Sequence, residues 1–103
     1  MAKEIILTDD KGNEYTLKFT RRSIKRMEQK GFDPSIAEKQ PMTTMYELFE
    51  GALYAAHPDL KREQIDELFE GLDDLNTWMD DLSELYQDKY TTSAGEMKRT
   101  KNW

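Results

Sequence analysis

The chain has 103 residues, of which 37% are hydrophobic and 35% are charged. This length predicts a single domain with one modest core, and the aliphatic and aromatic content argues against a chain that is disordered throughout. The absence of cysteine excludes disulfides, thiolate metal sites and cysteine catalysis. No apolar run approaches the length of about eighteen residues that a membrane span needs, so we expect neither a span nor a signal peptide.

The formal net charge of −6 is spread unevenly along the chain. Residues 1–40 carry nine basic and seven acidic side chains, whereas residues 41–90 carry three basic and thirteen acidic ones. A strongly acidic half repels polyanions, so the sequence predicts no binding of nucleic acid or of anionic membranes there.

Two short runs near the N-terminus predict a β-hairpin over residues 4–19. They are EIIL and EYTLKF, and in the second Tyr15, Leu17 and Phe19 alternate with polar residues, as in a half-buried strand. The intervening TDDKGNE is rich in turn formers, and its Gly12 is suited to positive φ. A calcium loop is the alternative for these acidic residues, but the ligand spacing of an EF-hand is missing.

The next segment predicts a helix over residues 21–30. Thr20 is a suitable N-cap, and Gly31 suits the left-handed position that follows a helix. Pro34 then favours one short turn, and Pro41 predicts the next break.

The least polar stretch predicts a helix over residues 44–57. Nine of the twelve positions from Met45 to Ala56 are apolar or aromatic, Thr44 has the capping-box spacing to Glu47, and Pro58 ends the helix. A helical projection leaves one narrow polar stripe, made of Glu47, Glu50, Gly51, Tyr54 and His57. A helix with so little polar surface is expected at the centre of a small bundle, covered by its neighbours.

Two further helices are predicted over residues 61–71 and 75–90, each with apolar residues at helical spacing. The fold class is therefore α+β, mainly α: an N-terminal hairpin followed by a bundle of about four helices. Residues 1–90 form the single expected domain. Residues 91–103 lack periodicity and are expected to be a disordered C-terminal tail.

No pattern in the sequence points to catalysis. His57 is the only histidine, and we interpret it as a helix-end residue whose imidazolium the helix dipole favours. The paired aspartates at 73–74 and 80–81 lie a heptad apart, so a solvated acidic face is preferred over a metal site. No glycine-rich phosphate loop or nucleophile motif is present, and we predict no catalytic, cofactor-binding or metal-binding residues.

A basic cluster on the predicted helix 21–30 admits several interpretations. It consists of Arg21, Arg22, Lys25 and Arg26. It is short and has no interleaved aromatic residues, so phosphate binding is disfavoured against docking on the acidic half of the fold or on an acidic partner.

The order of segments resembles the tail assembly chaperones of long-tailed phages and prophages of Gram-positive bacteria. The likeness runs over residues 4–90, from LTDDKGNEYTLKFTRRSIKRMEQKGFD through KQPMTTMYELFEGALYAAHPDLKREQIDELFEGL to LSELYQDKY. Its most specific pieces are a strand ending in FTRRSI, the helix end MEQKGF and the helix–turn–helix LFEGALYAAHPDLKREQID. None of these is a catalytic motif.

This resemblance implies a non-enzymatic factor that binds the tape-measure protein, keeps it soluble and helps recruit tail-tube subunits. It places the protein in the host bacterial cytoplasm and outside the mature virion, without membrane or nucleic-acid partners, and it leaves self-association open. The resemblance also allows a longer product made by translational frameshifting near the polar tail. The rival interpretation is a small acidic regulator, or DNA mimic, that binds a DNA-binding protein.

Four residues are the predicted contacts for a partner: Met42, Met45, Phe49 and Trp78. Methionine side chains pack adaptably against varied partner segments, and the chain has six of them. The competing interpretation is that these residues only fill a small core.

Overall fold

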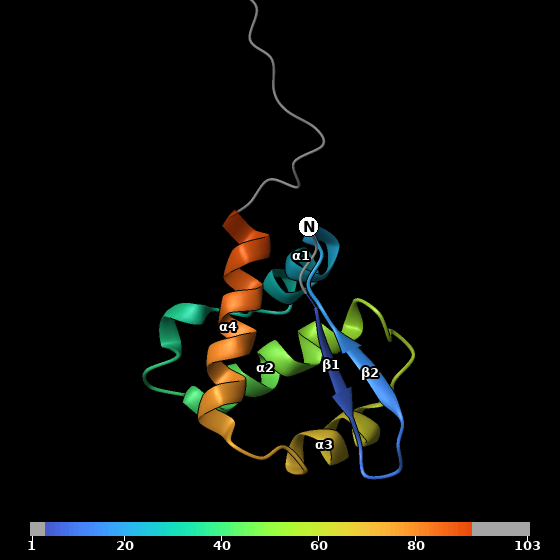
Figure 1. Cartoon of the computed structure of the whole chain (residues 1–103). Helices are drawn as coiled ribbons and strands as arrows, with labels where there is room; N and C mark the ends of the chain where they lie inside the picture. Colours follow the sequence, from blue (N-terminus) through green and yellow to red (C-terminus); the bar gives the residue numbers. More distant parts are fainter. Residues whose placement is uncertain (1–3, 92–103) are drawn as a thin grey trace, which may run out of the picture.

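The computed structural model describes residues 4–91, and it consists of an N-terminal antiparallel hairpin followed by four α-helices and one 3₁₀ turn (Figure 1). The predicted α+β, mainly α class is confirmed. The predicted disordered tail lies, from residue 92 onward, outside the described residues. The elements are β1 (Ile5–Thr8), β2 (Glu14–Leu17), α1 (Arg21–Gln29), η1 (Pro34–Ile36), α2 (Pro41–Tyr54), α3 (Arg62–Glu70) and α4 (Leu75–Thr91).

The hairpin forms where the alternating pattern predicts it. β1 and β2 pair antiparallel with Ile6 opposite Thr16. The turn is held by the Asp9 carboxylate, which accepts hydrogen bonds from the backbone N–H groups of Lys11 and Asn13 at 2.9 and 2.8 Å. Gly12 has a φ of +85°, which suits a residue without a Cβ.

Helix α1 begins and ends through local hydrogen bonds that the sequence predicts. The Thr20 hydroxyl accepts the Ser23 N–H at 3.0 Å, and the Ser23 hydroxyl accepts the Thr20 N–H at 2.8 Å, which is a reciprocal capping box. At the other end Gly31 has a φ of +94°, and the Phe32 N–H donates to the Met27 carbonyl at 2.9 Å.

Helix α2 starts and stops three residues earlier than predicted. Pro41 is its first residue rather than a break, because a proline at that position lacks only an N–H that would have no partner inside the helix. Thr44 is therefore not the N-cap; it is buried, and its hydroxyl donates to the Gln40 carbonyl at 2.9 Å. The helix ends at Tyr54, which leaves His57 beyond it.

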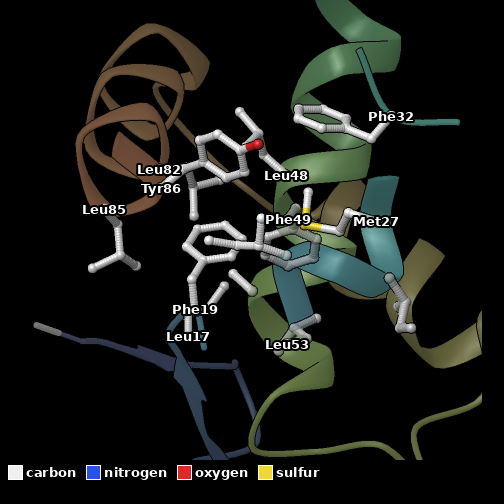
Figure 2. Packing of buried hydrophobic residues seen from close by; sticks show 13 residues of the cluster. Leu17, Phe19, Met27, Phe32, Leu48, Phe49, Leu53, Leu82, Leu85 and Tyr86 are labelled. Carbon is white, nitrogen blue, oxygen red and sulfur yellow. The ribbon is translucent and has the colours of Figure 1, made fainter. Parts of the chain in front are cut away.

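Helix α2 lies at the centre of the domain and packs against β2, α1, η1, α3 and α4 (Figure 1). The predicted central role of this segment is thus confirmed. Figure 2 shows the resulting core, in which side chains from the hairpin, α1, α2 and α4 converge. The residues with no exposed surface in the core are Leu17, Phe49, Ala52, Leu53 and Leu82.

The last two helices lie within one residue of their predicted ends. They begin after different caps: the Lys61 N–H donates to the Gln64 side chain at 3.0 Å before α3, whereas Asp74 accepts from the Thr77 hydroxyl at 2.8 Å before α4. Asp74 has a φ of +45°, a left-handed conformation that aspartate tolerates better than most residues. None of the described helices combines the length and apolar character needed to cross a membrane.

Candidate functional site

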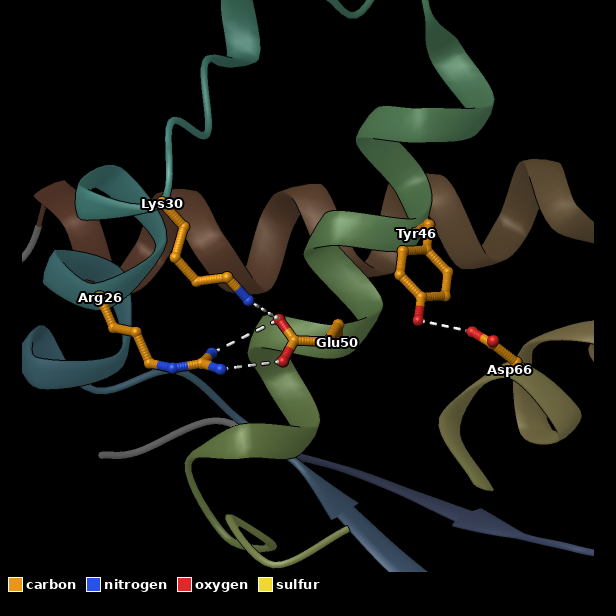
Figure 3. Close-up of polar contacts among 5 residues, drawn as sticks. All are labelled: Arg26, Lys30, Tyr46, Glu50 and Asp66. Atoms are coloured by element: carbon orange, nitrogen blue, oxygen red, sulfur yellow. Dashed lines mark hydrogen bonds and ion pairs between the residues drawn. The ribbon is translucent and has the colours of Figure 1, made fainter. Parts of the chain in front are cut away.

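The polar stripe of α2 is used for contacts inside the domain. The Glu50 carboxylate accepts two hydrogen bonds from the Arg26 guanidinium, at 3.2 and 3.4 Å, and lies 3.7 Å from the Lys30 ammonium (Figure 3). The same guanidinium stacks on the ring of Tyr54, with 3.7 Å between the central guanidinium carbon and the ring centroid. These contacts bind α1 to α2, so Arg26 docks on the acidic half of its own fold.

A second polar contact joins α2 to α3. The Tyr46 hydroxyl donates to the Asp66 carboxylate at 2.6 Å (Figure 3), and the Tyr46 ring meets the Phe69 ring edge to face. Burial raises the pKa of Tyr46 to about 12, and the hydrogen bond and negative charge of Asp66 act in the same direction. The sequence alone does not reveal this pair, because Tyr46 and Asp66 are twenty residues apart and share no local pattern.

The Tyr46–Asp66 contact predicts a stability loss at alkaline pH. A raised pKa means that the folded state keeps the tyrosine proton above pH 10, whereas the unfolded chain releases it. The stability from this group is complete below about pH 10 and is lost as the pH rises towards 12. In an absorbance titration at alkaline pH, the Tyr46→Phe variant should lack one of the tyrosines that ionise at the highest pH in the wild-type protein.

The Asp66→Asn variant is the control for this titration. It keeps a hydrogen-bond acceptor but removes the charge, so the Tyr46 transition should move towards pH 10 without disappearing. An unchanged titration in both variants would contradict the assignment.

His57 has a different role from the predicted one. It follows α2, and its Nε2 accepts the backbone N–H of Thr16 from β2 at 2.9 Å. The ring acts as a hydrogen-bond acceptor here, and the predicted place of His57 in the last turn of the helix is wrong because α2 ends at Tyr54. The side chain instead ties β2 to the end of α2.

The described carboxylates do not assemble into a metal site. Within residues 4–91, no group of three or more His, Asp or Glu side chains is placed to hold an ion. The four aspartates at 73–74 and 80–81 are exposed. Gly51, predicted on the polar stripe, is buried instead, because α1 crosses α2 at that point and Met27 covers it.

The four predicted partner-binding residues fall into two groups. Met45 and Phe49 are buried in the core, with 3% and 0% of their surface exposed. Met42 is 56% exposed in the first turn of α2, and Trp78 is partly exposed in the first turn of α4. In this conformation a partner reaches only Met42 and Trp78, because the other two point into the domain.

The basic cluster of α1 divides in a similar way. Arg26 pairs with Glu50, whereas Arg21, Arg22 and Lys25 are exposed. Two of these cations occupy the first turn of α1, where the helix dipole disfavours positive charge, and the turn holds no acidic residue.

A family model described as "Domain of unknown function (DUF5055)" matches residues 1–103. The chain belongs to the DUF5055 family. Comparison with curated proteins and with solved structures finds no match. In this member of the family, a hairpin packs on a central helix, with three further helices around it.

Proposed function

We propose that this DUF5055 protein is a non-enzymatic tail assembly chaperone of a long-tailed phage or prophage of Gram-positive bacteria. The observation that carries the proposal is the order of segments over residues 4–90, with FTRRSI, MEQKGF and LFEGALYAAHPDLKREQID at corresponding places. In this role the protein binds and solubilises the tape-measure protein and helps recruit tail-tube subunits. It acts in the host cytoplasm and is left out of the mature virion.

The physical properties of the described surface support this role. A tape-measure protein exposes apolar helical stripes, which aggregate in water unless another surface covers them. Met42 and Trp78 offer adaptable apolar area at the first turns of two helices. The net charge of −6 keeps a coated complex soluble.

Co-expression with a tape-measure protein tests the proposal. We expect the tape-measure protein to move from the insoluble to the soluble fraction and to co-purify with the chaperone. The Met42→Lys variant should reduce the co-purified amount several-fold, because a charge would have to be desolvated in the apolar contact. Met42→Leu, which keeps the volume and apolar character, is the matched control.

Two results would contradict the proposal. One is a tape-measure protein whose solubility is unchanged by the wild-type chain. The other is a complex whose co-purified amount Met42→Lys and Met42→Leu change equally. Met42 would then not belong to the surface that binds the tape-measure protein.

A second candidate function rests on the acidic face of α3 and α4. The exposed carboxylates on these helices and in the turn between them include Glu63, Glu67, Glu70, Asp73, Asp74, Asp80 and Asp81. Such a face suits a small acidic regulator or DNA mimic that binds a DNA-binding protein. A pull-down enriched in repressors or nucleases, with no tail protein, would favour this candidate.

A further inference from the structure

The two edges of the hairpin differ in how their outward backbone groups are satisfied. The Thr16 N–H of β2 donates to His57 Nε2 at 2.9 Å, and the N–H of Lys18, the residue after β2, donates to the Ala52 carbonyl at 3.0 Å. The end of α2 and His57, which follows it, therefore cover the β2 edge at Thr16 and Lys18. Among the described elements, the only one that pairs with β1 is β2, and the opposite edge of β1 has no partner strand.

The register shows which groups of β1 face outward. Because the Thr16 N–H points away from β1, the paired residue Ile6 also directs its N–H and carbonyl away from β2. The alternation gives the same orientation to Glu4 and Thr8. No hydrogen bond of these outward groups is found within residues 4–91. The Ile6 side chain is 51% exposed, and β1 itself contains no charged residue or proline that would guard the edge.

We propose that β1 pairs antiparallel with β1 of a second copy of this chain, about a two-fold axis at Ile6. This register places Ile6 against Ile6 and Glu4 against Thr8, so that the outward groups of both strands can form six backbone hydrogen bonds. A parallel pairing would place Glu4 directly opposite Glu4, and like charges at such positions are destabilising.

The closed β2 edges explain why the association stops at two copies. The dimer has a four-stranded sheet in the order β2–β1–β1–β2, and each outer edge is already bonded to His57 and Ala52 of its own chain. The end of α2 therefore blocks the pairing of a third copy at Thr16 and Lys18. The pairing is isologous, because the same residues contribute from both chains.

The dimer is expected to be weak and to strengthen with salt. Two four-residue strands bury little surface, so we expect a dissociation constant on the order of 0.1 mM. Each chain carries a net charge of −6, and salt screens the repulsion between the two copies. An association between the basic cluster of one copy and the acidic face of another would show the opposite salt dependence.

Sedimentation velocity from about 20 µM to 1 mM, with backbone hydrogen exchange by NMR, tests the proposal. We expect a monomer–dimer equilibrium that higher salt strengthens. The exchange of the Glu4, Ile6 and Thr8 amides should slow as the concentration rises. The Ile6→Pro variant deletes an outward N–H while leaving the β1–β2 bonds, and because Ile6 occurs twice at the axis it should weaken the dimer more than tenfold.

Ile6→Lys should also prevent the association, whereas Met42→Lys introduces the same charge on another element and should not. Circular dichroism of each variant establishes that the fold is retained.

A chain that stays monomeric at 1 mM would overturn the proposal, as would a dimer that Ile6→Pro leaves intact or that salt weakens. Slow exchange of the three amides at every concentration would also overturn it, by assigning the edge to a segment of the same chain. None of these measurements involves the tape-measure protein, so they are independent of the proposed chaperone function.

Discussion

Replacing Phe49 by alanine is expected to lower the free energy of unfolding by about 3–5 kcal/mol. The Phe49 side chain has no exposed surface, and its ring lies 5.7 Å from the Phe69 centroid and 6.4 Å from that of Trp78. Its removal leaves a cavity between α2, α3 and α4 that the surrounding rings fill only in part. Because small domains are stable by about 5–15 kcal/mol, this loss is a large share of the total. Urea denaturation followed by circular dichroism measures it.

Met42→Ala is the control, since the two residues belong to the same helix and were predicted to have the same role. Met42 is 56% exposed, so its truncation should change the free energy of unfolding by no more than about 0.5 kcal/mol. Similar losses for both variants would contradict the placement of Phe49 inside and Met42 outside. The comparison also separates the two interpretations of the predicted partner residues, namely core filling and partner contact.

Replacing Gly51 by alanine is expected to destabilise the protein by about 1–3 kcal/mol, although alanine favours helix over glycine by about 1 kcal/mol. A Cβ at this position would overlap the Met27 sulfur and would lie 2.9 Å from Cε and 3.0 Å from Cγ of the same side chain. Met27 is itself buried, with 3% of its surface exposed, and has little room to move. The substitution therefore forces the buried Met27 side chain to move and disturbs the contact between α1 and α2.

A double-mutant cycle with Met27→Ala tests whether the contact with Met27 causes this destabilisation. With the methionine removed, the added Cβ has space, and Gly51→Ala should then raise the stability by up to about 1 kcal/mol. Gly71→Ala is a further control, because a Cβ there meets only ordinary contacts at 3.6 Å or more. If Gly51→Ala stabilised the wild-type protein, the close approach of α1 and α2 would be refuted.

Phe49 and Met42 show that the sequence pattern of one segment does not predict which of its apolar residues are buried. Both residues lie in the same apolar stretch. Helical periodicity predicted that only the narrow polar stripe of this stretch would face solvent, so it did not distinguish the two residues. Four elements besides β2 pack on α2, and their arrangement decides that the first turn stays open while the middle is covered. A pattern within one segment does not contain the positions of its neighbours.

The polar stripe predicted over residues 47–57 shows the opposite error, because residues expected at the surface contact other elements. Glu50, Tyr54 and His57 were expected to face water, but they meet α1 and β2. Each partner comes from a segment twenty or more residues away, so no spacing rule could reveal it. The predicted start of α2 was wrong because Pro41 and Thr44 both suit a helix beginning; the helix starts at Pro41, and Thr44 is buried within it.

The sequence by itself determined the hairpin, the number and approximate bounds of the helices, and the helix ends at Thr20 and Gly31. These depend on hydrogen bonds and φ values within a few residues, which local chemistry controls. Only the tertiary structure decided which apolar residues remain accessible, that Gly51 lies under Met27, and that one edge of the hairpin is closed while the other is open. Those features depend on distant segments meeting, and burial is a property of the assembled domain.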